Sequence, residues 1–268
     1  MARRTKIIAT IGPASEDEST LRGMIEAGMD VARIGLAHGT LDEQVNKFHM
    51  VRHVASDLGK HVGIVVDLPG PKVRCAPFKE GGVELIDDTQ ISLGVEGLES
   101  CSDFISVDYP NLLQDIQLGD SLSFGDGQVV VSVEEREGDR LKARVVHGGR
   151  LEGRPGIHIP SDRLRLSSPT DHDLTLLDTF VELGTDMVAL SFVRSAHDIR
   201  RLGVEPAPRG PMVIAKIETK AAVSNLEGII EASGAVMVAR GDLGSEEDIE
   251  ELPHLQKHII QELSLIHI

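Results

Sequence analysis

Continuous apolar runs and segments with helical spacing alternate near both ends of the chain. The runs do not alternate with polar residues, which is typical of strands buried on both faces of a parallel sheet. We expect six such strands, at residues 6–11, 31–36, 61–66, 187–193, 212–217 and 235–239.

Helix signals fall between these runs. Ser15 stands three residues before Glu18, and Thr40 stands three residues before Glu43, so each pair predicts a capping box at a helix start. Gly28 and Gly59 act as stop signals for these two helices. Further helices are expected from Pro169, after Ser195, over residues 221–231 and from about residue 252.

The pattern changes between residues 72 and 157. Short strands with turn signals predominate there, and Gly138 with Asp139 predicts the turn of a hairpin. No helix is expected in this stretch. We therefore predict three parts: residues 1–71 as the first part of a barrel, residues 72–157 as an inserted all-β lid domain, and residues 158–268 as the second part of the barrel.

Strands followed by helices, interrupted once by a β module, indicate an α/β fold. The pattern fits a TIM (β/α)8-type barrel that carries a lid, and it also fits a doubly wound open sheet. A closed barrel needs eight strands, and this sequence supplies six, so the barrel is expected to be incomplete.

Composition narrows the possible partners. The 268 residues include 43 acidic and 27 basic side chains, a net charge of −16. Nucleic acids and anionic membranes bind basic surfaces, so neither is expected as a partner.

Cys75 and Cys101 form no CxxC motif, and the N-terminus has no signal-peptide pattern. These features predict a cytoplasmic protein without a zinc site.

Charged residues stand at or just after the ends of the predicted strands. They are Arg33, Asp67, Arg194, Lys216, Glu218, Arg240 and Asp242, together with the polar Ser191. In a TIM barrel this face is where catalytic residues converge. Lys216 and Glu218 are two residues apart, so they point to the same face of their strand. Two carboxylates here can hold Mg²⁺ while the cations bind a phosphate, and structural ion pairs closing the barrel end are the alternative.

Two other signals are interpreted as structural. Arg240, Gly241 and Asp242 spell RGD, which is an adhesion motif only on an exposed loop of an extracellular protein. His254 and His258 stand one turn apart on a predicted helix. They have no evident third ligand, so we interpret them as solvated side chains.

Six motifs along nearly the whole chain resemble the pyruvate kinase family in order and spacing. They are TKIIATIGPAS, GMDVARIGLAHGT, VVDLPGPKVR, VALSFVR, IAKIETKAAVSNL and VMVARGDLG. The resemblance implies a TIM barrel with a mobile β-domain inserted after the third strand. It also implies phosphoryl transfer from phosphoenolpyruvate to ADP, giving pyruvate and ATP, with Mg²⁺ or Mn²⁺ as cofactor.

The resemblance assigns roles to single residues. Lys216 resembles the lysine that stabilises the transferred phosphoryl group, and Arg33 the arginine that holds the phosphate of phosphoenolpyruvate. Glu218 and Asp242 resemble the Mg²⁺ carboxylates. The backbone at Gly241 and Asp242 resembles the site of the substrate carboxylate.

Further positions resemble the surroundings of the family's site. Arg74 matches an arginine near the nucleotide phosphates, and Phe192 and Arg194 match supporting positions. His38 either contacts the nucleotide or caps the loop before Thr40. The family also implies a homotetramer for a full-length chain.

The monovalent cation site departs from the family pattern. Gly35, Ala37 and Leu68 replace residues whose side-chain oxygens form the K⁺ site together with the aspartate matched by Asp67. Lys72 replaces a glutamate, and its ammonium group could supply the charge of K⁺. These positions resemble the K⁺-independent branch of the family, so we predict that K⁺ is not required.

Other functions stay open at this point. One is a Mg²⁺-dependent lyase or aldolase of the wider phosphoenolpyruvate/pyruvate-binding barrels, and another is a noncatalytic relative that binds without turnover. Family members continue into two more barrel strands and a regulatory domain. We therefore expect a C-terminally truncated fragment, which would be inactive by itself if those strands are essential.

Overall fold

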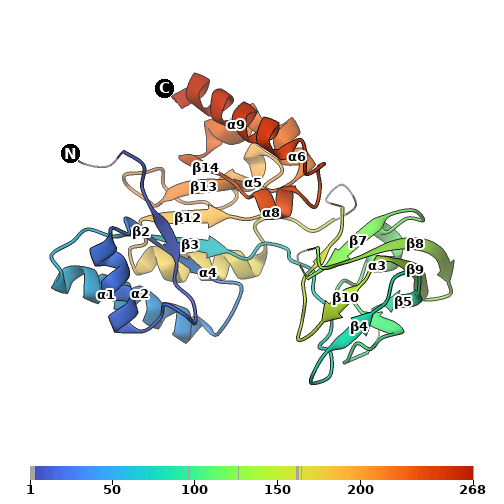
Figure 1. Ribbon diagram of the computed structural model, residues 1–268. Coiled ribbons are helices and arrows are strands. Elements are labelled where there is room, and N and C mark those ends of the chain that lie inside the picture. The colour runs from blue at the N-terminus through green and yellow to red at the C-terminus, as the bar shows by residue number, and fades with distance from the viewer. Residues whose placement is uncertain (1–3, 96, 126, 161–162, 164, 268) are drawn as a thin grey trace.

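The computed structural model describes residues 4–95, 97–125, 127–160, 163 and 165–267. A six-stranded, all-parallel sheet forms an open half-barrel in the order β1-β2-β3-β12-β13-β14 (Figure 1). The strands are β1 Ile8–Thr10, β2 Val31–Gly35, β3 Gly63–Leu68, β12 Met187–Leu190, β13 Met212–Ile217 and β14 Ala235–Val238. All six expected strands are present. The strand at residues 212–217 has the expected bounds, and each of the others differs by one to three residues at one or both ends.

Helices cover one face of this sheet and fill the main core. They are α1 Glu18–Ala27, α2 Leu41–Asp57, α4 Asp171–Glu182, α5 Ala196–Arg200, α6 Lys220–Ser224, α7 Leu226–Ala232, α8 Arg240–Leu243 and α9 Leu252–His267. Because strand side chains alternate between faces, Ile64 and Val66 pack toward the helices, whereas Val65 joins a separate cluster with Ala189 and Ile214. The second cluster is the inner face of the half-barrel.

The segment between β3 and α4 forms a separate β domain with its own hydrophobic core. A six-stranded mixed sheet has the order β11-β7-β8-β9-β5-β6, beside a two-stranded sheet of β4 and β10. The elements are β4 Val83–Leu85, β5 Gln90–Gly94, β6 Phe104–Ser106, α3 Leu112–Asp115, β7 Ser121–Phe124, β8 Val129–Glu137, β9 Arg140–His147, β10 Gly149–Leu151 and β11 Ile157–His158. Figure 1 shows this domain, hereafter the lid, extending to one side of the half-barrel.

Several local predictions are confirmed. Thr40 and Glu43 form the expected capping box of α2. Gly138 and Asp139 connect β8 to β9, and Gly138 takes the positive φ of 61° that favours glycine in such a turn.

Other local predictions are wrong. The cap of α1 is Asp17, which accepts from the Thr20 N–H at 2.9 Å, because Ser15 instead bonds with Gly12 in the preceding turn. The helix expected from Pro169 begins at Asp171, with Thr170 as its cap. The short helix α3 lies in a stretch where no helix was expected.

The helix expected over residues 221–231 is divided in two. Asn225 separates α6 from α7, and its side-chain amide donates to the Arg194 carbonyl at 3.0 Å. The amide also donates to the Ala221 carbonyl. A side chain that bonds to nearby backbone in this way competes with the regular helical pattern.

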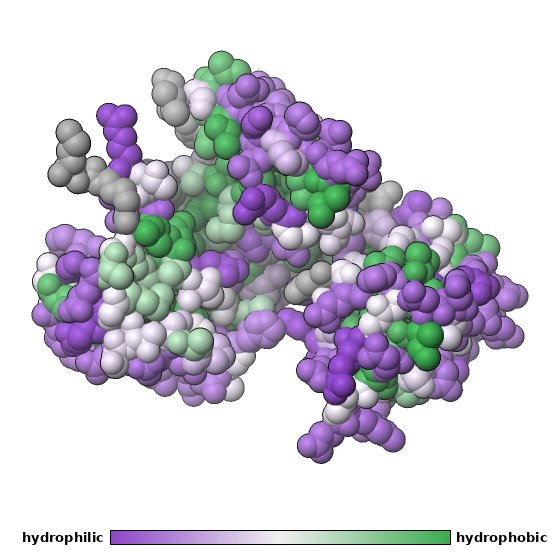
Figure 2. Space-filling view, viewed as in Figure 1, coloured by the Kyte–Doolittle hydropathy of each residue, from purple (hydrophilic) through white to green (hydrophobic). Residues whose placement is uncertain are grey.

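Both edges of the parallel sheet are open. Among the described strands, β1 pairs only with β2, and β14 only with β13. Ile8 on β1 is 48% exposed, and Figure 2 shows apolar side chains gathered around β1 and below α9. Within the described residues, no helix combines the length and apolar character needed to cross a membrane.

Candidate active site at the strand ends

A cavity of about 780 Å³ lies at the carboxyl ends of the parallel strands. Each of the six strands contributes a lining residue at or shortly after its end. These residues include Thr10, Arg33, Gly35, Asp67, Leu68, Ser191, Lys216, Glu218 and Asp242. Parallel strands bring their ends to the same edge, so residues from distant parts of the sequence meet here.

Lys216 occupies the centre of this group. Its Nζ lies 2.8 Å from Glu218 Oε1 and 3.3 Å from Asp67 Oδ1. It also donates a 2.8 Å hydrogen bond to Ser191 Oγ. Because the side chain is largely buried, two carboxylates and a hydroxyl replace most of the water that would otherwise solvate the ammonium group.

Glu218 is held from two sides. Its Oε1 faces Lys216, and its Oε2 accepts from the Phe192 N–H at 2.7 Å. Phe192 has a positive φ of 54°, an uncommon conformation for a residue with a side chain. The turn after β12 thus points a backbone N–H at a carboxylate that is only 1% exposed.

Asp67 binds the second cation of the site, Arg33. Arg33 binds Asp67 Oδ2 through Nε at 2.7 Å and Nη2 at 2.5 Å. The Arg33 Nη1 donates to Thr10 Oγ1 at 2.9 Å, which fixes the guanidinium plane across β1, β2 and β3. Asp67 therefore links Arg33 to Lys216.

Burial and neighbouring charges shift the pKa values of Lys216 and Glu218. Burial alone would lower the pKa of Lys216, but Glu218 and Asp67 together hold that pKa above its ordinary value. Burial raises the pKa of Glu218, and Asp242 adds to this rise while Lys216 opposes it. The site therefore favours a charged lysine and makes it costly for Glu218 to carry a negative charge without a further cation.

Asp242 supplies a second carboxylate at the same cavity. Within the described part of the chain, its side chain has no hydrogen-bond or ion-pair partner, and it is half-buried. Carboxylate oxygens from Glu218 and Asp242 fit a hard divalent cation such as Mg²⁺. A cation there would also offset the cost of charging Glu218.

A smaller cavity of about 280 Å³ opens between the lid and the half-barrel. Gly241 and Asp242 line it from the barrel side, and His158 lines it from the lid. Lys72 borders both cavities, with its side chain against Gly156.

All five positions expected at the monovalent cation site line the larger cavity: Gly35, Ala37, Asp67, Leu68 and Lys72. Of these, Asp67 contributes a carboxylate, which is already bound to Arg33 and Lys216. The fold therefore brings these five positions together, and Arg33 and Lys216 both form ion pairs with Asp67.

Other predicted residues lie in different surroundings. His38 lines the larger cavity, and its carbonyl accepts from the Gln44 side chain. Arg74 lines neither cavity, and its guanidinium donates to the Arg154 carbonyl within the lid. Arg194 donates to the Leu166 carbonyl at 2.6 Å, on the chain that returns from the lid. The Arg240–Asp242 sequence forms helix α8 rather than a projecting loop.

Sequence reasoning missed two partners of the site. Thr10 orients Arg33, and Glu246 contacts the lid through His158. The position of Thr10 at the end of the first apolar run was an available signal, whereas Glu246 stands among several acidic residues that look alike in the sequence.

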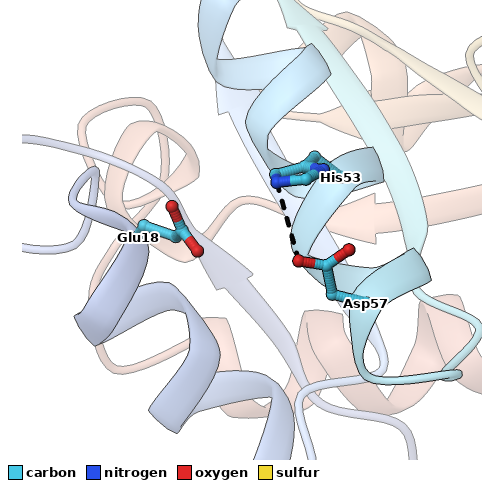
Figure 3. A group of neighbouring side chains, drawn as sticks. All are labelled: Glu18, His53 and Asp57. Carbon is cyan, nitrogen blue, oxygen red and sulfur yellow. Dashed lines mark ion pairs between the residues drawn. The ribbon is translucent and has the colours of Figure 1, made fainter.

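A separate cluster on α1 and α2 has the side chains of a metal site (Figure 3). Glu18, His53 and Asp57 are exposed and come close enough to share an ion. Arg22 already forms ion pairs with Glu18 at 3.2 Å and with Asp57 at 3.5 Å. This positive charge offsets the two carboxylates, so we interpret the cluster as a solvated network between helices.

Comparisons with known proteins match nearly the whole chain. The family model described as "Pyruvate kinase, barrel domain" matches residues 2–267. A pyruvate kinase of Mycobacterium tuberculosis is 39% identical over 263 residues, covering 97% of this chain and 56% of the relative. One of Thermococcus litoralis is 39% identical over 266 residues, covering 98% and 56%.

A pyruvate kinase of Bacillus licheniformis is 35% identical over 269 residues, covering 98% of this chain and 46% of the relative. The chain thus spans about half the length of the curated relatives it matches.

Proposed function

The chain belongs to the pyruvate kinase family, and we propose that the complete protein transfers a phosphoryl group from phosphoenolpyruvate to ADP, giving pyruvate and ATP. The observation that carries this proposal is the convergence of Lys216, Arg33, Glu218 and Asp242 on one cavity at the strand ends. An ammonium, a guanidinium and two carboxylates at this face suit phosphate chemistry.

Phosphoryl transfer depends mainly on position and charge. Lys216 would lie beside the transferred group and neutralise its oxygens, since its raised pKa keeps it protonated. Arg33, held by Asp67 and Thr10, would present its remaining N–H groups to the phosphate of phosphoenolpyruvate. The backbone at Gly241 and Asp242 would bind the substrate carboxylate.

Glu218 and Asp242 would hold the divalent cation, Mg²⁺ or Mn²⁺. When bound, the ion supplies positive charge to the phosphate oxygens. The Phe192 N–H and Lys216 keep Glu218 oriented toward the cavity.

We also propose that turnover does not need K⁺. Gly35, Ala37 and Leu68 offer no side-chain oxygen, and Lys72 borders the same cavity with a positive charge. Strict activation by K⁺ would contradict this proposal.

Several broader assignments stay proposals. Residues 72–157 would be the lid, between barrel parts at residues 1–71 and 158–268, with the boundary moved one residue to include His158, the last residue of the lid strand β11. His38 and Arg74 would contact the nucleotide, and Arg74 would need lid movement to reach it, because it now bonds within the lid. A homotetramer and a cytoplasmic location are proposed from the family alone.

The test is a coupled assay of pyruvate formation from phosphoenolpyruvate and ADP with Mg²⁺, with and without K⁺. It uses this chain and a chain completed from its genomic locus, each beside Lys216→Ala. We expect the completed chain to turn over without K⁺ and Lys216→Ala to lose about 10²-fold or more in kcat.

Two outcomes of these experiments would contradict the proposed kinase activity. Binding of phosphoenolpyruvate without turnover in the completed chain would indicate a noncatalytic relative. Cleavage or condensation of a keto acid without nucleotide would indicate a lyase or aldolase. The lid favours the kinase, because closure over a nucleotide gives this domain a use.

A further inference from the structure

One buried carboxylate joins the lid to the half-barrel. Glu246 follows α8, and its side chain is only 3% exposed. Its Oε1 lies 3.4 Å from His158 Nε2 on strand β11 of the lid. Its Oε2 accepts from the Lys220 N–H at 3.3 Å, at the start of α6 in the barrel. A buried carboxylate needs such partners, so this one depends on both domains at once.

The contact lies at the base of the lid. His158 is the last residue of β11, and β11 is the last strand of the lid. On the other connection, the Gly70 N–H donates to Asp173 at 3.0 Å. Both of these contacts involve the segments that connect the two domains, and the one made by Glu246 reaches a strand of the lid sheet itself.

The contact also borders the active-site region. His158 and Asp242 line the smaller cavity from opposite domains. Glu246 stands four residues after Asp242 on the same short segment. Movement of β11 away from Glu246 would therefore widen this cavity and act on the segment that carries Asp242.

We propose that Glu246 is a positioning residue that, through His158, sets the angle of the lid over the strand ends. Its second anchor at Lys220 keeps the carboxylate fixed to the barrel, so that β11 turns about a defined point. This role concerns the position of the lid and does not depend on the proposed reaction.

His158 suits a neutral contact. Burial lowers its pKa, with Lys72 acting in the same direction and Glu246 and Asp242 opposing. A carboxamide at position 246 can bond to a neutral imidazole and to a backbone N–H, so Glu246→Gln is the conservative replacement.

The experiment measures the distance between spin labels on the two domains by pulsed electron paramagnetic resonance. One label is attached to Cys101, which is exposed on the lid, and the other to Glu182→Cys on the exposed end of α4. Cys75 is buried and stays unlabelled. We expect Glu246→Ala and His158→Ala each to broaden and shift the distance distribution, and Glu246→Gln to preserve it.

Glu247→Ala is the matched control, because within the described residues the Glu247 side chain has no hydrogen bond or ion pair, and it should leave the distribution unchanged. If both Glu246→Ala and His158→Ala keep the native circular dichroism and the native distribution, the proposal is wrong. A broadened distribution for Glu247→Ala would equally overturn it. No turnover is needed, so failure of the proposed reaction would leave this result intact.

Discussion

Lys216 is the cation that contacts both buried carboxylates of the site, Glu218 and Asp67. We expect Lys216→Ala to destabilise the chain by about 3–5 kcal/mol, because Glu218 would lose the cation that contacts it within the described residues. Asp67 would still have Arg33. Urea denaturation followed by circular dichroism measures this change.

The matched control is Lys220→Ala, an exposed lysine nearby whose loss should cost about 0.5 kcal/mol or less. A loss for Lys216→Ala no larger than that of Lys220→Ala would show that the buried ion pairs contribute little.

Glu218 gives a pH prediction with a defined sign. Burial raises its pKa in the folded chain above the ordinary value of 4.5, so the folded state binds its proton more tightly than the unfolded state does. The charged carboxylate therefore costs stability above the folded pKa, and the cost diminishes as the pH falls toward 4.5. Glu218→Gln has no ionisable group at this position, so its stability lacks this dependence on pH.

We expect the unfolding free energy of the unmodified chain to rise relative to that of Glu218→Gln as the pH is lowered from neutral. Parallel urea titrations of both chains at several pH values measure the difference, in which the other titrating groups cancel. If the difference stays constant or changes in the opposite sense, the effect of Lys216, which lowers the pKa of Glu218, outweighs the effect of burial, which raises it.

The two cysteines should differ in reactivity. Burial raises the pKa of Cys75 to about 12, so its thiolate is scarce and inaccessible, whereas Cys101 is exposed. We expect an alkylating reagent to modify one thiol in the folded chain and two in urea, as counted by mass spectrometry. Cys101→Ser should leave none reactive in the folded chain, and rapid labelling of Cys75 there would contradict its burial.

The chemistry of the site was more predictable than its contacts. The period of two in a strand was enough to predict Lys216 and Glu218 on one face, and both line the same cavity. The bond from Lys216 to Ser191 needs β12 beside β13, and that from Lys216 to Asp67 needs β3 beside β12. Sequence spacing cannot supply such neighbours, because they depend on the order of strands in the sheet.

At the scale of an element, helix α4 combines a cap with a tether to the segment that leads from β3 into the lid. Thr170 and Asp173 form a capping box, and Asp173 also accepts from the Gly70 N–H. We expect Thr170→Ala to cost about 1 kcal/mol. Asp173→Ala should cost about 2–3 kcal/mol, since it also leaves a partly buried N–H without a partner. Urea denaturation of both variants measures the costs.

Asp171 provides the control on the same helix. It is exposed in the first turn and contributes only its charge near the helix N-terminus, so Asp171→Ala should cost about 0.5 kcal/mol. Equal costs for Asp171→Ala and Asp173→Ala would contradict the tether.

Elements were predictable where the local signal was strong. All six strands and the capping box at Thr40 followed from spacing alone. Ser15 and Asp17 both offer cap chemistry, and the choice between them depends on the turn at Gly12. The break at Asn225 depends on a bond to the Arg194 carbonyl of another segment. Such tertiary bonds override local propensity and are not visible in a window of sequence.

At the scale of the molecule, the inserted domain was predictable, but its contact with the barrel was not. A change from helical spacing to short strands marks the insertion. His158 and Glu246 carry no motif, and their contact depends on the placement of β11 against the segment after α8. Interdomain contacts of this kind are found only once both folds are assembled.

The open half-barrel leads to the last prediction. Ile8 on the unpaired edge of β1 is 48% exposed, and it is level with Val31, which packs with the inner cluster. An unpaired strand edge with exposed apolar side chains is a surface on which another chain can add a strand. We expect the isolated chain to self-associate with increasing concentration and Ile8→Lys to reduce this, as measured by sedimentation velocity.

The control separates the edge from general solubility. Ile86 directly follows β4 of the lid and is 65% exposed. Figure 1 shows β4 well away from the N-terminal strand, so Ile86→Lys adds the same charge without protecting the edge. If Ile8→Lys and Ile86→Lys suppress association equally, the effect comes from the loss of an exposed apolar side chain anywhere on the surface. Net charge cannot cause it, because a lysine added to a chain of net charge −16 weakens repulsion in both variants. If only Ile8→Lys suppresses it, association runs through the open sheet edge, and any partner that covers β1 should stabilise the chain by an amount that grows with the logarithm of its affinity.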